Sequence, residues 1–268
     1  MSYTQSNIKV EIGEHEIEDE TDMFQVEHFD GLTEKISTCN IEQNNQFGLW
    51  DGITVTKGDL FKLYFKYSHE EDWKQIFDGY VLYVHKDESV LRLICVDRTH
   101  QLTVRDNLST FSNSKPEDIL NDLLNSKEYD FESVNIDETE EDVEMAFLSL
   151  RDESFIDAVN MIERKLQLEY RLYCDATGNL YYKPKPTELG DIKYKYIYGD
   201  NVISADYLHE ELLKMYVFEV DISLYDFVSY ENEFEEKKNY LVVGVVASCG
   251  VNEEDTRCIL YLEELTDD

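Results

Sequence analysis

The chain of 268 residues has only 3 prolines and 11 glycines, and it has no long run of apolar residues. So little proline and glycine excludes a collagen-like or linker-like protein. No segment approaches the roughly 18 consecutive apolar residues that a membrane-spanning helix needs. The beginning of the sequence also lacks the basic and apolar regions of a secretion signal. We therefore expect the chain to be made and folded in a cytoplasm, without membrane insertion.

Basic residues are scarce, because 24 lysines and arginines stand against 59 acids and give a net charge of -35. Phosphate binding requires clustered Lys and Arg, so this charge argues against sequence-specific binding of nucleic acid. Two explanations of the acidity stay open. An anionic channel would let DNA pass without sticking, and a salty cytoplasm would favour excess carboxylates. The 17 lysines and 7 arginines weaken the second explanation, because basic residues have not been removed selectively.

Residues for catalysis or metal binding form no recognisable motif. The cysteines are odd in number, widely spaced and set in apolar runs without a CxxC pair: Cys39, Cys95, Cys174, Cys249 and Cys258. We expect them to be small buried side chains in a reducing compartment. The six histidines form no HExxH pair, and no GxSxG, P-loop or GxGxxG is present. The sequence thus predicts no catalytic residue, no cofactor and no metal site, and we expect a protein that is not an enzyme.

Hydrophobic residues make up 42% of the chain and aromatic residues 13%, which is enough for a folded core. Residues 8–110 alternate apolar and polar side chains with a period of two, which is typical of strands. Residues 77–102 predict a hairpin that is apolar on both faces, with Val81, Tyr83 and His85 on one and Tyr80, Leu82 and Val84 on the other. A sheet with one solvated face does not need this pattern. We therefore expect a barrel whose outer face meets a neighbouring subunit, with Tyr83 and Leu93 in that interface.

The middle of the chain changes in character. A helix is expected from Ser114 and Pro116, because Ile119, Leu120, Leu123 and Leu124 then form an apolar stripe. A second helix is expected from Ser154, since Ser154 and Asp157 have the spacing of a capping box. Strands follow around a turn in which Gly178 accommodates a positive φ. Between the two helices, residues 132–144 are highly charged and predict a solvated loop.

These patterns predict a mainly β (α+β) fold, with two small tube-like β-barrels flanking a short α/β segment. The expected domains are a first β-barrel over residues 1–110, an α/β insertion over 111–200 and a second β-barrel region over 201–268.

Several segments, taken in order, resemble the tail hub family of phages, the late-control D and XkdQ-like baseplate hub proteins. The segment TVTKGDLFKLYF resembles the family's strand-turn-strand step at Gly58 and Asp59. The hairpin that follows resembles one in which Gly79 opens a strand and Asp97 ends the next. The first helix, and then the second helix with its hairpin at Gly178, complete a likeness that covers roughly residues 45–205.

This resemblance implies a homotrimeric ring that joins a six-fold tail tube to a three-fold spike in the baseplate or tail tip of a virion. The implied partners are the tail tube, spike, tape measure and other baseplate proteins, and DNA or other cargo would pass through the ring. The alternatives are a β-rich adaptor of a tail or contractile injection system and, less favoured, a carbohydrate- or peptidoglycan-acting enzyme.

Overall fold

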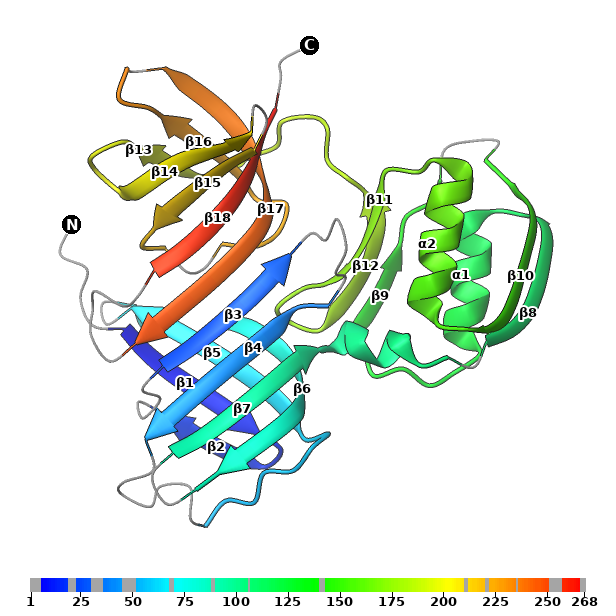
Figure 1. The fold of residues 1–268 in the computed structure, drawn as a ribbon, viewed down its shortest axis with the longest axis horizontal. Coiled ribbons are helices and arrows are strands. Elements are labelled where there is room, and N and C mark those ends of the chain that lie inside the picture. Colours follow the sequence, from blue (N-terminus) through cyan, green and yellow to red (C-terminus); the bar gives the residue numbers. More distant parts are fainter. Residues whose placement is uncertain are drawn as a thin grey trace. The chain divides into compact units, whose positions relative to one another are not determined.

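A computed structural model of the chain describes residues 6–18, 23–29, 36–44, 52–67, 70–87, 90–105, 107–139, 143–209, 212–219, 222–234, 236–250 and 257–265. Strands dominate this part of the chain, which also contains two α-helices and one 3-10 helix (Figure 1). The mainly β, α+β fold class predicted from the alternating patterns is therefore confirmed.

The chain forms two compact units. Unit 1 comprises residues 1–97 and 186–268, and unit 2 comprises residues 98–185, inserted between them. The sequence patterns placed the boundaries at 110 and 200 instead. The positions differ because η1 (Arg98–Thr103) and β8 (Asn107–Ser114) belong to unit 2, whereas β13 (Ile192–Ile197) belongs to unit 1. The division of unit 1 into two separate barrels stays a prediction.

Unit 1 is built on a single curled sheet of 13 strands. Besides β13 these are β1 (Ser6–Ile12), β2 (His15–Glu18), β3 (Met23–Phe29), β4 (Thr38–Asn44), β5 (Leu60–Tyr67), β6 (Lys74–Lys86), β7 (Val90–Asp97), β14 (Val202–His209), β15 (Leu212–Val217), β16 (Phe227–Glu231), β17 (Lys237–Gly250) and β18 (Arg257–Glu264). The main path runs β14-β15-β18-β17-β3-β4-β7-β6-β5-β1-β2, and β16 joins β13 to β17.

Period-two alternation explains the core of unit 1. Every second residue is buried from Ile8 in β1 and from Phe61 to Phe65 in β5, and fully buried Val10 of β1 lies opposite fully buried Leu63 of β5. Each such side chain contributes about 1.5–3 kcal/mol when it leaves water. The buried residues of the N-terminal and C-terminal strands belong to one apolar cluster. The antiparallel pairing of β17 with β3 makes the two groups of strands continuous.

Some expected elements differ from the observed ones. Residues 53–56, which were expected to form a strand before Gly58, have no regular secondary structure. Residues 133–136 form a short strand rather than a solvated loop. The polar residues Asp30–Gly31 and Glu88–Ser89, each between two apolar runs, also predict turns, and both positions lie outside the described residues.

Unit 2 contains two helices and two small sheets. Its elements besides η1 and β8 are α1 (Pro116–Asn125), β9 (Ser133–Ile136), β10 (Met145–Glu153), α2 (Phe155–Leu166), β11 (Tyr170–Cys174) and β12 (Asn179–Pro184). Strands β8 and β10 form a two-stranded antiparallel ribbon, and β11-β12-β9 form a three-stranded sheet. In Figure 1 the helices lie side by side between the ribbon and this sheet.

Both helices begin where the sequence predicts, and both bury an apolar face. Pro116 is the first residue of α1, and the expected stripe of α1 is buried. A capping box starts α2, because the Ser154 side chain accepts from Asp157 N while the Asp157 carboxylate accepts from Ser154 N. These bonds satisfy two amide groups that a helix start leaves unpaired.

Gly79 lies within β6 rather than at its start, and it marks a close approach of two strands. A Cβ atom at Gly79 would lie 2.0 Å from the carbonyl oxygen of Val96 and 2.8 Å from Cα of Asp97. Both of these atoms belong to the backbone of the paired strand β7, so neither can move away without disturbing the sheet.

We therefore expect Gly79→Ala to lower the free energy of unfolding by at least about 3 kcal/mol, because the added methyl group forces β6 from β7. Gly52→Ala is the matched control, since a Cβ there meets nothing within 4 Å; it should change stability by less than about 0.5 kcal/mol. Urea unfolding of both variants measures the difference. Equal midpoints for Gly79→Ala and the wild type would contradict the close approach.

Candidate assembly surface

A β-bulge decides which side chains of the β6–β7 hairpin face outward. Val81 pairs with Cys95, but Tyr83 pairs with Ile94, so Leu82 is an extra residue in β6. The expected faces of this hairpin are therefore wrong. Val81 faces the core and is only 1% exposed, whereas Tyr83, two positions later, faces solvent. The bulge reverses the alternation that a regular strand would keep.

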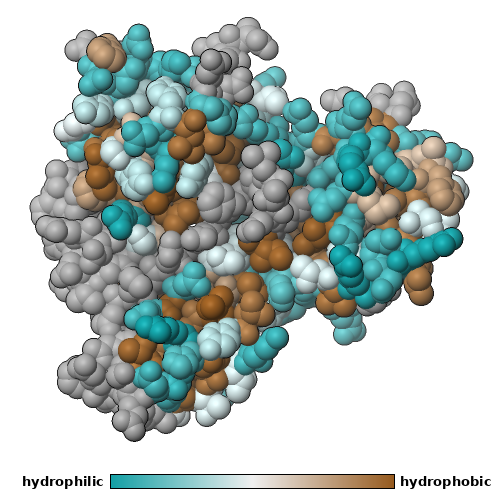
Figure 2. All heavy atoms as spheres, in the orientation of Figure 1, coloured by the Kyte–Doolittle hydropathy of each residue, from teal (hydrophilic) through white to brown (hydrophobic). Residues whose placement is uncertain are grey.

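Tyr83 and Ile94 form an exposed apolar pair, directly opposite each other on the outer face of the hairpin. Their exposed fractions are 53% and 40%. The next pair on the same face is polar, with His85 opposite Arg92. The Arg92 guanidinium makes an ion pair of 2.9 Å with Glu42 of β4. An apolar centre with a charged rim is typical of a protein–protein contact surface. Figure 2 shows hydrophobic side chains among hydrophilic ones on the face in view.

Leu93 lies on the other side of the sheet. It is 1% exposed and belongs to the core cluster of unit 1. The expectation that Leu93 contacts a neighbouring chain is thus wrong, because the bulge at Leu82 places its paired residue Val84 against the core. Ile94 takes the outward position that was assigned to Leu93. The sequence did contain a sign of this, because Ile94 is apolar and, as the neighbour of Leu93 in the strand, points to the opposite face.

A second surface of mixed character covers the outer face of β15 and β18. Lys214 of β15 pairs with Tyr261 of β18. The Lys214 Nζ atom lies 5.0 Å from the ring centroid of Tyr216 and 5.9 Å from the ring centroid of Tyr261. Ile259 pairs with Tyr216 on the same face. All four side chains are half-buried. These strands therefore carry apolar groups on both faces, as a subunit interface requires.

Gly58 and Asp59 form a turn that fixes the start of β5. Gly58 has φ +96°, which favours glycine. The Asp59 carboxylate accepts hydrogen bonds from the amide and hydroxyl groups of Thr56, at 2.7 and 2.9 Å. The turn is tied to β6, because Gly58 N donates to Val81 O and Val81 N donates to Asp59 O. These residues position the hairpin and bring no reactive group to its surface.

Asp97 is the last residue of β7, as predicted, and it is buried. Its carboxylate accepts from Ser37 N at 2.8 Å, while its own amide donates to Ser37 O at 3.0 Å. These two hydrogen bonds join the end of β7 to Ser37, the residue before β4. Asp97 therefore stabilises the sheet that carries Tyr83 and Ile94.

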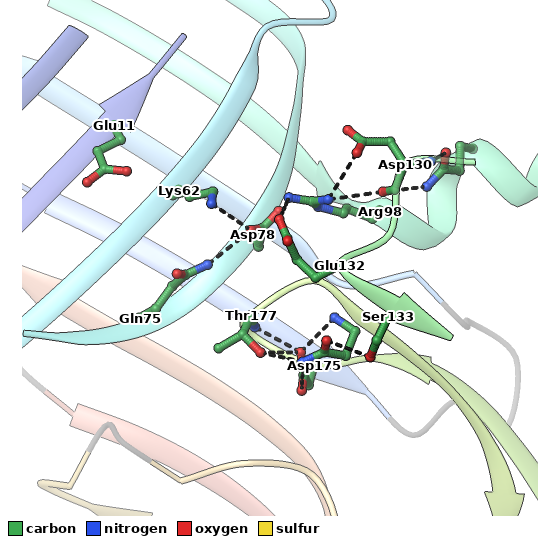
Figure 3. Close-up of polar contacts among 12 residues, drawn as sticks. Glu11, Lys62, Gln75, Asp78, Arg98, Asp130, Glu132, Ser133, Asp175 and Thr177 are labelled. Carbon is green, nitrogen blue, oxygen red and sulfur yellow. Dashed lines mark hydrogen bonds and ion pairs between the residues drawn. The ribbon is translucent and has the colours of Figure 1, made fainter. Parts of the chain in front are cut away.

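Gly178 leaves room for the side chain of a buried arginine, Arg98, in unit 2. Gly178 has φ +86°, as predicted, and a Cβ there would lie 2.9 Å from Arg98 Nε. Arg98 is 2% exposed and donates to Asp130 O at 3.1 Å and to Glu132 Oε1 at 3.0 Å (Figure 3). A lone arginine after a strand carried no sequence signal for this role. Together with Asp130 and Glu132 it anchors the start of unit 2.

Metal-ligating side chains and cysteine thiols could each bring reactive chemistry to the described residues. No group of three or more His, Cys, Asp or Glu among them is arranged to hold a metal ion. Burial raises the pKa of the Cys39 and Cys95 thiols, so neither supplies a thiolate nucleophile near neutral pH. No helix in the described ranges has the length and hydropathy needed to cross a membrane.

No family model and no curated protein matches the chain. Solved structures do match, over almost its whole length. The 43 kDa tail protein of prophage MuSo2 from Shewanella oneidensis has a TM-score of 0.72 at 12% identity, covering 96% of each chain. A tail protein from Neisseria meningitidis MC58 has a TM-score of 0.75 at 9% identity, covering 97% of this chain and 96% of its own.

A third similar structure is the E. coli c3393 protein. It is described as a component of the type VI secretion system with structural similarity to the bacteriophage T4 tail proteins gp27 and gp5. Its TM-score is 0.68 at 11% identity, covering 97% of this chain and 77% of its own. The chain therefore has the fold of these phage tail and type VI secretion proteins.

Proposed function

We propose that the chain is a structural hub protein of a phage or phage-like tail, located at the baseplate or tail tip. The observation that carries this proposal is the likeness to tail proteins over 96% or more of the chain. Both compact units take part in this likeness. The likeness therefore concerns the complete arrangement of strands and helices, rather than one common β-motif.

In this proposal the chain forms a homotrimeric ring, with two β-regions of each chain facing a six-fold tail tube and the ring facing a three-fold spike. The exposed pair Tyr83 and Ile94, and the Lys214–Tyr261 surface, are apolar centres suited to contacts in such an assembly. The similarity to a type VI secretion component, itself described as similar to the T4 tail proteins gp27 and gp5, supports a place in a tail or tail-like assembly. Tube, spike and tape measure proteins are the proposed partners.

The acidic composition suits the proposed passage of DNA or other cargo. A ring of chains that each carry a net charge of -35 repels a polyanion from its walls. The proposal makes the protein a non-enzymatic part of the virion, assembled in the host cytoplasm. An adaptor that stays monomeric is the main competing function, and the mass in solution separates the two.

We expect the purified chain to form a trimer, with three times its mass of 31.6 kDa, alone or after mixing with its tube or spike partner. Light scattering at about 0.5 M salt measures this mass under conditions that screen surface charges. A chain that stays monomeric with every candidate partner would contradict the hub and favour an adaptor.

Tyr83→Asp should leave the monomer folded but prevent assembly, because the new carboxylate would be buried unpaired in the contact. Leu93→Asp should instead unfold the monomer, since that side chain is 1% exposed; a loss of more than about 4 kcal/mol is expected. Circular dichroism and light scattering measure folding and assembly in turn.

Thr54→Asp is the matched control for Tyr83→Asp, because it adds the same charge at an exposed position outside the hairpin. It should assemble like the wild type. Normal assembly of Tyr83→Asp would show that the outer face of the hairpin is not a contact.

Assembly should also depend on salt. Chains of net charge -35 repel one another, and this repulsion grows as ions are removed. Lowering the salt from about 0.5 M to about 0.02 M should therefore shift the ring toward monomers, since the screening length rises from a few ångströms to more than 20 Å. A ring with the same stability at both concentrations would contradict this expectation.

A further inference from the structure

Three arginines converge on one cavity in unit 2, the arginine pocket, defined by Arg105, Arg151 and Arg164. The cavity measures about 580 Å³. Arg151 comes from the end of β10, Arg164 from α2, and Arg105 follows η1. Asn160 and Met161 line the wall of the cavity on the same helix face as Arg164. The chain has only 7 arginines, so this gathering is a large share of them.

Three carboxylates also line the arginine pocket, those of Asp152, Glu153 and Asp157, and the last two are engaged in local bonds. Asp157 accepts from the amide and hydroxyl groups of Ser154, at 3.0 and 2.8 Å, and these bonds cap α2. Hydrogen bonding from Ser154 keeps the pKa of Asp157 below its usual value. Arg105 lies 3.7 Å from the same carboxylate. Glu153 accepts from the backbone amide of Arg151. Glu153 and Asp157 therefore bind local backbone groups rather than the guanidinium groups of Arg151 and Arg164.

Arg151 and Arg164 are exposed, and their guanidinium groups make no ion pair or hydrogen bond within the described part of the chain. This is unusual in a chain with 59 acidic residues, because a guanidinium is always charged and binds carboxylates in a bidentate geometry. The α2 amide dipoles add positive potential at the end of the helix that adjoins β10. An anionic group from outside the chain would satisfy both arginines.

Apolar side chains adjoin these arginines. Leu108 of β8 pairs with Arg151 across the ribbon and is 80% exposed, which is the largest exposure among the large apolar residues described. Val104 precedes Arg105 and is 56% exposed. Within the described residues β8 and β10 pair only with each other, so each leaves one edge open to another strand. The surface thus combines cationic groups, exposed apolar groups and a free strand edge.

We propose that the arginine pocket and Leu108 bind an acidic peptide segment of a partner protein, with a large apolar residue beside its carboxylates. The arginines bind the carboxylates and Leu108 covers the apolar residue. A nucleic acid fits less well, because the net charge of -35 repels a long polyanion and phosphates would not use Leu108. This inference does not depend on the proposed hub function.

The test measures binding of a fluorescein-labelled peptide, in which glutamates flank a leucine, to the full chain by fluorescence anisotropy at about 0.05 M salt. The double variant Arg151→Ala/Arg164→Ala should bind at least about tenfold more weakly, because each guanidinium loses a charge-assisted hydrogen bond. Leu108→Ser should also weaken binding several-fold. Arg257→Ala, which removes an exposed arginine of unit 1, should leave the affinity unchanged.

Each alternative gives a different result. No binding, or equal binding by the wild type and the double arginine variant, would overturn the proposal. If a peptide without leucine binds as tightly, and sulfate displaces both peptides alike, the pocket is a simple anion site and the proposal is wrong. Tighter binding of labelled single-stranded DNA at the same arginines would also overturn it. So would a loss of self-association in the double variant, measured by light scattering, since the occupant would then be a second copy of the chain.

Discussion

The antiparallel pairing of β3 with β17 is the interaction on which unit 1 depends. It joins strands separated by about two hundred residues of chain, with the whole of unit 2 inserted between them. Without it the N-terminal strands would end in an open edge at β3, and the C-terminal strands would end in one at β17. Contacts of such sequence separation carry a large loop-closure entropy and form slowly. The continuous core that runs across this junction offsets that cost.

Much of the fold could be predicted from local patterns. The α2 capping box, the apolar stripe of α1 and the turn at Gly178 depend on residues within a few positions of one another. The same holds for the alternation in β1 and β5. The short strand β9 was not predicted from the sequence because it pairs in parallel with β12. Parallel strands are not joined by a tight turn that could be recognised in the local sequence.

The candidate surface was predicted only in part, for a related reason. Tyr83 faces outward as expected, but the side chains around it could not be assigned to faces from the sequence. The bulge at Leu82 arises from the register between β6 and β7. No residue near Leu82 in the sequence indicates this register. The arginines of unit 2 escaped prediction because their convergence depends on the fold, which brings a strand end, a helix face and a turn together. Arg98 depends likewise on Gly178, 80 positions away.

The bulge also has a consequence for how this chain can change over evolution. In β6, Val81 faces the core before the bulge and Val84 faces it after the bulge, so a single extra residue sets which later side chains face outward. Insertions and deletions at this point exchange the two faces of everything that follows, whereas substitutions alter one side chain at a time. Loss of the bulge would therefore replace the outward-facing side chains of the hairpin in one step. The protein would still fold only if the side chains newly turned inward were apolar enough to pack in the core. The two-sided apolar composition of the hairpin keeps that route open.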